Sequence, residues 1–259
     1  MRRFLKTLPL TLALVLALTG LGLVLTSCNS SQAQARFVDA IAESPEMDID
    51  FNGGRDFTEI TFPSYQPSSG YRSVASGSVT IEGVLSGGTT EVFSTSNVNL
   101  SSGTEYTVVA TGTTANTNGV VFLTPADDNT EPADGQVSFR VIDAAISSPN
   151  QVFIYILPNL SNGEGPGIQN ASVTMTVTAP SAPTTATSGY IPQGFNSLNT
   201  GFTGYVCYEP EGTVVFSFLI PNFGSATLGA IRTIVLTDNS TQTGFNTSQT
   251  DQIILHDVN

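Results

Sequence analysis

Arg36-Phe-Val-Asp-Ala40 and Arg140-Val-Ile-Asp-Ala144 open two halves of the sequence in the same way, at an offset of 104 residues. At the same offset, each is followed by a Ser-Pro pair and then by a run typical of a strand. These are Ser44-Pro45 with Met47-Asp-Ile-Asp-Phe51, and Ser148-Pro149 with Gln151-Val-Phe-Ile-Tyr155. Self-similarity over this distance indicates a duplicated domain.

The later parts of the two halves keep the same order, although the gaps between them change. The matching segments are Ser69-Gly-Tyr71 with Thr203-Gly-Tyr205, Tyr106-Thr-Val-Val-Ala-Thr111 with Arg232-Thr-Ile-Val-Leu-Thr237, and Val120-Val-Phe-Leu123 with Ile253-Ile-Leu255. The segments at 120–123 and 253–255 each lie shortly before an acidic residue. Because the tyrosines at 71 and 205 match, we expect a structural role for them, such as a packed corner, more than a ligand contact. The second half also contains an insertion near 157–190, with one strand candidate at 171–178.

Short alternating runs separated by turn residues recur about every 8 to 12 residues, which is typical of a sandwich or barrel. Examples are Ser78-Val-Thr-Ile-Glu82 and Thr213-Val-Val-Phe-Ser-Phe218. No stretch after residue 28 has the 3.6-residue period of an amphipathic helix. The sequence therefore predicts an all-β fold.

The N-terminus has the layout of an export signal. Basic residues in Met1-Arg-Arg-Phe-Leu-Lys6 precede an apolar stretch at 8–25, and Leu25-Thr-Ser-Cys28 resembles the bacterial lipobox. This resemblance implies cleavage before Cys28 and acylation of its sulfur, so the lipid bilayer is the expected first partner. An uncleaved N-terminal anchor is the alternative. Asn29 follows the cysteine, which favours the outer membrane where the source has one.

Composition limits the function classes. Without 1–27 the chain keeps five arginines and no lysine against 21 carboxylates, a formal charge of −16. Nucleic acid is bound through clustered Lys and Arg, so it is not an expected partner. The predicted organisation is a signal peptide (1–27), a tether (28–34), domain 1 (35–123), a polar linker (124–135) and domain 2 (136–259).

The chain resembles the bacterial secreted and lipoprotein family called domain of unknown function 4397. The resemblance depends on the two Arg-x-x-Asp-Ala segments, on Met47-Asp-Ile-Asp-Phe-Asn-Gly53 and on Gly103-Thr-Glu-Tyr-Thr-Val-Val109. It covers most of 35–157 and weakens beyond. It implies two tandem immunoglobulin-like β-sandwich domains after an N-terminal signal helix, located outside the cytoplasm. The family supplies no activity or catalytic residues.

One segment satisfies the calcium-loop pattern of an EF-hand, with Asp48, Asp50, Asn52, Gly53 and Glu59 in the required places. An EF-hand needs flanking helices, whereas this segment matches a strand in the second half. Asn52-Gly-Gly54 then predicts a hairpin turn, with the two aspartates on the solvent face of the strand. Calcium binding by Asp48, Asp50, Asn52 and Glu59 is the alternative, and no cofactor is expected.

Catalytic constellations are hard to assemble from this sequence. Its single histidine, His256, lies near the end, and Cys207 in Tyr205-Val-Cys-Tyr208 is expected to be a buried, inert thiol. No Gly-x-Ser-x-Gly motif is present, and no carboxylate pair is singled out. We expect a non-enzymatic envelope module that binds an unknown envelope or extracellular partner or has a structural role. An envelope-polymer hydrolase and a calcium-dependent adhesion module are the alternatives.

Overall fold

The computed structural model describes residues 32–114, 119–148, 151–160, 168, 171–172, 174–181, 186–194, 199–207, 209–210, 214–221, 229–238 and 252–258. Over these residues the chain forms strands and turns and no helix, so the predicted all-β class is confirmed. In this part of the chain, no segment forms a helix that is both long and apolar enough to span a membrane. The predicted signal peptide and Cys28 lie outside the described residues.

Domain 1 is a β-sandwich of two sheets, whose strands are β1 (Ala33–Asp39), β2 (Met47–Phe51), β3 (Gly54–Ile60), β4 (Ser64–Gln66), β5 (Arg72–Val74), β6 (Gly77–Leu85), β7 (Glu91–Leu100), β8 (Glu105–Gly112) and β9 (Val120–Leu123). Its outer sheet has the order β3-β2-β6-β7, and its inner sheet has the order β4-β1-β8-β9, with β5 also paired to β1. A core that includes Phe37, Phe57 and Phe93, none of them exposed, fills the space between the sheets.

Domain 2 repeats this strand order, with strands β10 (Gln136–Asp143), β11 (Val152–Leu160), β12 (Met175–Val177), β13 (Ile191–Gly194), β14 (Asn199–Cys207), β15 (Val214–Pro221), β16 (Ile231–Leu236) and β17 (Gln252–Val258). Its inner sheet is β13-β10-β16-β17 and its outer sheet is β12-β11-β14-β15. Strand β12 occupies the place of β3, so the strand expected at 171–178 is the counterpart of a domain 1 strand. The connection that precedes it, 161–174, is far longer than the Asn52-Gly53 turn.

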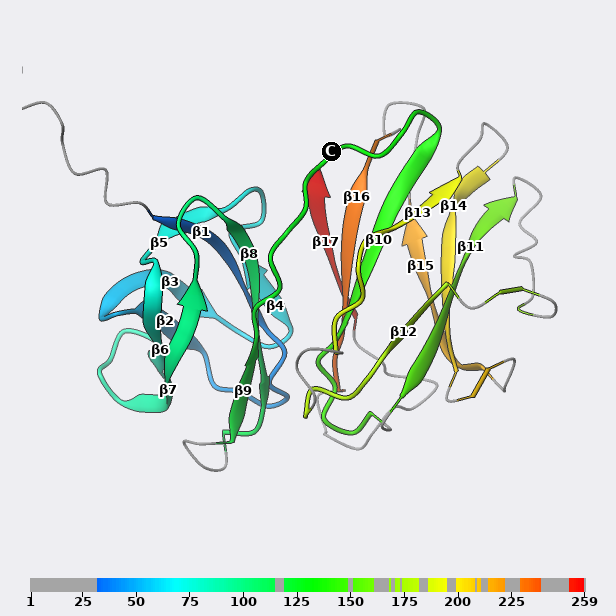
Figure 1. The fold of residues 1–259 in the computed structure, drawn as a ribbon. Coiled ribbons are helices and arrows are strands. Elements are labelled where there is room, and N and C mark those ends of the chain that lie inside the picture. Colours follow the sequence, from blue (N-terminus) through cyan, green and yellow to red (C-terminus); the bar gives the residue numbers. More distant parts are fainter. Residues whose placement is uncertain are drawn as a thin grey trace, which may run out of the picture.

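The inner sheets of the two domains pack face to face, which gives four β layers in succession (Figure 1). A third apolar cluster lies between them, separate from the cores of the two sandwiches. Its buried members come from both inner sheets, from the residues that directly follow β1 and β10, and from one loop of domain 2: Val38, Ala40, Val109, Leu123, Ile142, Ala144, Ala186, Val235, Ile253 and Leu255.

This packing explains why the central inner strands are buried on both faces. Successive residues of a strand point to opposite sides of the sheet. In β8 and β10 every residue after the first is nevertheless buried, and all of β16 is buried. The pairs β1·β8 and β10·β16 are parallel, the arrangement that usually has both faces covered.

Candidate functional site

The junction between the inner sheets holds two arginines, one from each domain. Arg36 lies in β1 between Ala35 and Phe37, which point into the core of domain 1, so the strand pleat directs Arg36 toward domain 2. Arg140 has the same position in β10, next to Phe139 and Val141 of the domain 2 core. Both arginine residues are almost completely buried, at 2% and 1% exposure.

In domain 1, Arg36 belongs to a set of four side chains that we call the domain 1 quartet: Arg36, Tyr71, Thr107 and Asp127. Arg36 Nε donates to Thr107 Oγ1 at 2.8 Å, and its guanidinium carbon lies 5.3 Å from the centre of the Tyr71 ring. The hydroxyls of Thr107 and Tyr71 both donate to Asp127 Oδ2, each at 2.7 Å. The quartet therefore joins β1 and β8 to the segment that follows β9.

Domain 2 contains the same arrangement, the domain 2 quartet: Arg140, Tyr190, Thr233 and Asp257. Arg140 Nε donates to Thr233 Oγ1 at 3.1 Å, and its guanidinium carbon lies 4.6 Å from the Tyr190 ring centre. Asp257 Oδ2 accepts from the Thr233 hydroxyl at 2.7 Å and from the Tyr190 hydroxyl at 3.2 Å. Each residue thus has the role of its domain 1 counterpart.

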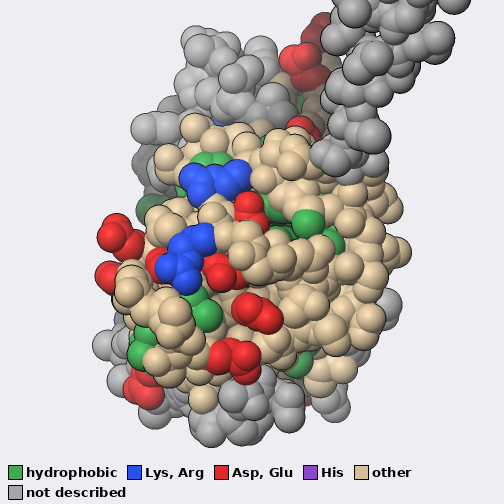
Figure 2. Space-filling model, turned by 90° about the vertical axis from the view of Figure 1, so that its left-hand side faces the viewer, with side chains coloured by type: hydrophobic (Ala, Val, Ile, Leu, Met, Phe, Trp, Pro, Cys, Tyr) green, Lys and Arg blue, Asp and Glu red, His purple; other side chains and the backbone are tan. Residues whose placement is uncertain are grey.

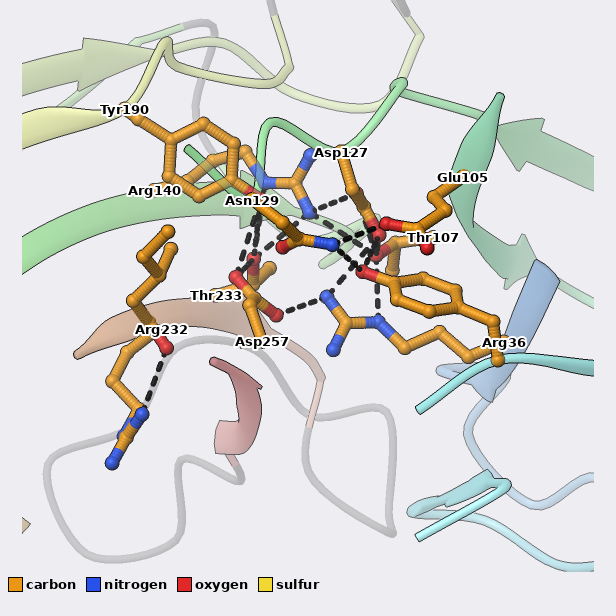
Figure 3. A network of polar contacts seen from close by, with 12 residues as sticks. Arg36, Glu105, Thr107, Asp127, Asn129, Arg140, Tyr190, Arg232, Thr233 and Asp257 are labelled. Atoms are coloured by element: carbon orange, nitrogen blue, oxygen red, sulfur yellow. Dashed lines mark hydrogen bonds and ion pairs between the residues drawn. The ribbon is translucent and has the colours of Figure 1, made fainter. Parts of the chain in front are cut away.

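The two quartets are joined by ion pairs that cross the junction in both directions (Figure 3). Arg140 Nη2 lies 2.6 Å from Asp127 Oδ1. In the opposite direction, Arg36 Nη2 pairs with Asp257 Oδ1. Each arginine therefore pairs with the aspartate of the other domain, which is the pattern of an interface between two equivalent surfaces.

Burial determines the chemistry of these groups. The arginine side chains of the ion pairs are 2–3% exposed, and those of Asp127 and Asp257 are not exposed. Burial opposes the charge on Arg36, but Asp257 and Asp127 outweigh it and raise the pKa of Arg36. Burial is also the main reason why the pKa values of Tyr71 and Tyr190 are raised. Both tyrosines therefore stay protonated and donate to the aspartates.

A second carboxylate approaches the domain 1 quartet from its edge. Asn129 Nδ2 donates to Tyr71 Oη at 3.1 Å and also to Glu105 Oε2. Within the described residues, Asn129 Oδ1 is buried without a hydrogen-bond partner. The segment 124–135, predicted as a linker, thus contributes both Asp127 and Asn129 to the junction.

The aspartates of the two Arg-x-x-Asp-Ala segments belong to a second repeated structure, a turn that follows β1 in domain 1 and β10 in domain 2. Asp39 accepts from Ile41 N at 3.0 Å and from Ser44 Oγ at 2.6 Å. Asp143 accepts in the same way from Ala145 N at 3.1 Å and Ser148 Oγ at 2.6 Å. Burial raises the pKa of Asp39 to about 6 and that of Asp143 to about 7.

The calcium-pattern residues lie in a β-hairpin. Asn52 and Gly53 have φ angles of 53° and 77° and form the turn between β2 and β3, so the hairpin prediction is confirmed. The expectation that Asp48 is on a solvent face is wrong, because it is 3% exposed. It accepts from Glu59 N at 2.9 Å and Gly87 N at 3.1 Å, and the loop before β7 covers it.

Arg55 occupies the space between the two aspartates of this pattern. Its Nη1 lies 3.0 Å from Asp48 Oδ2 and its Nε lies 3.3 Å from Asp50 Oδ1. Burial tends to raise the pKa of Asp48, but the backbone hydrogen bonds and the Arg55 charge hold it below its usual value. Across the described ranges no group of three or more His, Cys, Asp or Glu could hold a metal ion. Calcium binding stays an alternative for experiment to test.

The tyrosine match between the halves needs a correction. Tyr205 lies in β14, opposite Tyr155 and Ser217, and has no part in the domain 2 quartet. The counterpart of Tyr71 is Tyr190, which precedes β13 as Tyr71 precedes β5. The sequence contains a signal for this pairing, because Ser69-Gly-Tyr71 recurs unchanged as Ser188-Gly-Tyr190. The structural role expected for Tyr71 agrees with its contacts.

Of the remaining sequence candidates, Cys207 lies at the end of β14, in the outer sheet of domain 2. Cys207 is buried as predicted, and burial raises the pKa of its thiol. The His256 side chain lies outside the part that the structure describes. Figure 2 shows the outer side of domain 1, where basic side chains lie among acidic ones.

Two grooves follow the rim of the junction. One, of about 190 Å³, is lined by Gly112, Val121 and Ile146 among others, and the second, of about 400 Å³, by Tyr65 and Gln252 among others. Among the residues that the structure describes, neither groove is lined by an Asp, Glu, Lys, Arg or His side chain. Carboxylates and tyrosines do converge in this protein, but they do so inside the junction, where they bind one another.

Comparison with known proteins supports the family resemblance for part of the chain. Residues 33–153, which include domain 1 and the first strand of domain 2, match the model of the family described as domain of unknown function DUF4397. That domain 2 is a further copy stays a prediction. No curated protein matches the chain.

The solved structures that match the chain include two described as alpha-glucan binding by a streptococcal virulence factor and as alpha-glucan recognition by family 41 carbohydrate-binding modules from streptococcal virulence factors. The first has 9% identity and a TM-score of 0.29, over 87% of this chain and 97% of that one. The second has 7% identity and a TM-score of 0.27, over 78% of this chain and 93% of that one. A multi-modular glycogen-degrading pneumococcal virulence factor matches with 8% identity and a TM-score of 0.30, over 88% of this chain and 22% of that one. TM-scores this low support neither a fold nor a function for this chain.

Proposed function

We propose that this chain is a lipid-anchored envelope protein that acts without catalysis, as a stiff two-domain module that holds its outer surfaces at a fixed distance from the membrane. The observation that supports this most directly is the junction. Two apposed sheets, an apolar cluster and two crossed ion pairs join the domains, so that bending between them would expose buried charge.

The state of the ionisable groups favours a non-enzymatic role. A general acid or base must come within hydrogen-bond distance of a substrate. Asp127 and Asp257 have no exposed side-chain surface, and arginine, threonine and tyrosine occupy their oxygens. The described lining of the two rim grooves includes no charged side chain. A hydrolase would therefore need reacting groups other than these.

The anchoring part of the proposal depends on the lipobox-like Leu25-Thr-Ser-Cys28. Strand β1 begins at Ala33, only five residues after that cysteine. A chain this short would hold domain 1 next to the bilayer, and domain 2, on the far side of the junction, would face outward. The partner that domain 2 meets would belong to the envelope or the cell exterior.

Two experiments test the proposal. For the anchor, cells that express the chain are labelled with an alkyne fatty acid, and we expect label in the membrane fraction that Cys28→Ala abolishes. Equal labelling of this variant would contradict lipid attachment.

For the stiff module, pairs of spin labels are placed at Thr58→Cys and Gln151→Cys, both at exposed positions in different domains. Buried Cys207 should remain unlabelled. We expect one narrow distance distribution, as narrow as that from a control pair within domain 1, Thr58→Cys with Glu91→Cys. A broad distribution across the junction alone would refute a fixed spacing.

A further inference from the structure

The domain junction has the symmetry of a homodimer interface, although one chain forms both sides of it. Arg36 binds Asp257, and Arg140 binds Asp127, so exchanging the two domains maps each of these two ion pairs onto the other. The contact between Arg36 and Asp127, 3.4 Å long, is an addition on the domain 1 side. The apolar cluster is matched as well, since it contains Val38 with Ile142, Val109 with Val235, and Ala40 with Ala144. In symmetric dimers, identical patches meet in this reciprocal way.

We propose that a second copy of this chain is a binding partner, and that two copies form a dimer by exchanging domains at the junction. In this dimer, the inner sheet of domain 1 in one copy packs on the inner sheet of domain 2 in the other, twice. The contacts between the two inner sheets are retained, and the path of the connection between Asn129 and Gln136 differs.

The balance between the two forms depends on concentration. Two sites on one chain with a short connection meet at an effective concentration on the order of millimolar. The contacts being equal, a dilute chain therefore closes on itself. Chains that are crowded on a surface, as the proposed membrane anchor would arrange them, exchange domains more readily.

Reversal of the charges on one face at a time provides a direct test in the two-domain chain from residue 29 onward. The first variant, Arg36→Asp with Asp127→Arg, reverses the domain 1 face and keeps opposite charges within that domain. The second, Arg140→Asp with Asp257→Arg, reverses the domain 2 face. In each variant alone, like charges meet across the junction. An exchanged dimer of the two variants has two junctions. At one, the reversed domain 1 face of the first variant meets the reversed domain 2 face of the second, so opposite charges meet. At the other, the two unaltered faces meet, and opposite charges meet there as well.

The expected result is a 1:1 heterodimer in sedimentation equilibrium, at twice the monomer mass, when the two variants are mixed at micromolar concentration. Each variant alone should not form this species. A mixture in which both variants are folded, by circular dichroism, and yet stay monomeric would overturn the proposal. The matched control is Arg72→Asp with Glu91→Arg, two exposed positions outside the crossed ion pairs, and this variant should stay monomeric in a mixture with either reversed variant.

A second measurement applies if a reversed variant fails to fold. Two unaltered chains that differ only in isotope label are unfolded together and refolded at about millimolar concentration, comparable with the effective concentration above. Mixed-label dimers that dissociate slowly on dilution support domain exchange. Refolding to monomers alone under these conditions overturns it.

Discussion

Replacement of Asp127 by asparagine tests the energetic weight of the junction. The carboxylate lies 2.6 Å from Arg140 and 3.4 Å from Arg36, and it has no exposed surface. The substitution Asp127→Asn nearly preserves the volume and shape of the side chain, so its main effect is to remove the charge. Two buried arginines are then left with Asp257 as their one carboxylate partner in the quartets.

The magnitude follows from the burial of these charges. Removal of one partner from a buried ion pair costs about 3–5 kcal/mol. A pair of unit charges 4 Å apart, at an effective dielectric constant of about 20, gives a similar figure of about 4 kcal/mol. Total stabilities of folded domains are about 5–15 kcal/mol, so Asp127→Asn should remove a large part of the stability of the protein.

Urea unfolding followed by circular dichroism measures this loss. With a slope of about 2–3 kcal/mol per molar, the midpoint should fall by about 1–2 M. Asp128→Asn is the matched control, since Asp128 is the next residue, is exposed, and accepts from Thr130 N at 3.0 Å without contact to either arginine of the described ion pairs. A midpoint shift for Asp127→Asn no larger than that of the control would refute the assignment of the junction as a stabilising buried network.

Three further predictions concern pH, packing and calcium. Burial raises the folded-state pKa of Asp39 to about 6 and that of Asp143 to about 7, above the unfolded value of about 3.9. Their protonation therefore stabilises the fold fully below about pH 4, and this contribution is lost as the pH rises to 6–7. The double variant Asp39→Asn, Asp143→Asn should therefore lose less stability than the parent between pH 4 and 7 in urea titrations, and a pH-independent difference would contradict this. Gly83→Ala should destabilise by about 1–3 kcal/mol, because its Cβ would lie 2.5 Å from the buried Phe93 ring, whereas Gly194→Ala, which meets no atom within 4 Å, should be neutral in thermal melts. Calcium should raise the melting temperature no more than magnesium does, because Arg55 already pairs with Asp48 and Asp50; a calcium-selective rise that Asp50→Ala abolishes would instead identify a site.

Local sequence patterns anticipated much of the fold. The alternating runs predicted strands, Asn52-Gly53 predicted the hairpin turn, and the offset between the two Arg-x-x-Asp-Ala segments predicted the equivalence of β1 and β10. These succeeded because turn geometry and the two-residue period of a strand are set by neighbouring residues. The match of 106–111 with 232–237 likewise gave the correct register, since Thr107 and Thr233 pair with Arg36 and Arg140.

The candidate site could not be predicted in the same way. The period of a strand says which residues share a face, but it does not say what that face meets. Arg36 and Thr107 could equally have faced solvent, and Asp127 lies in a polar, proline-containing segment that has the composition of a linker. The strand period likewise predicts a solvent face for Asp48. The residues that cover this side chain are Gly87, which is distant in the chain, and Arg55, which the hairpin brings back alongside it.

The sequence by itself determined the all-β class, the matched segments of the two halves and the residues that end each inner strand, because these depend on local propensity and spacing. Only the tertiary structure decided that the two inner sheets face each other, that Tyr190 and not Tyr205 is the counterpart of Tyr71, and that Asp127 and Asp257 exchange arginine partners. The physical reason is that these contacts join residues far apart in the chain, and the free energy of burying their charges together exists only once both sheets have formed.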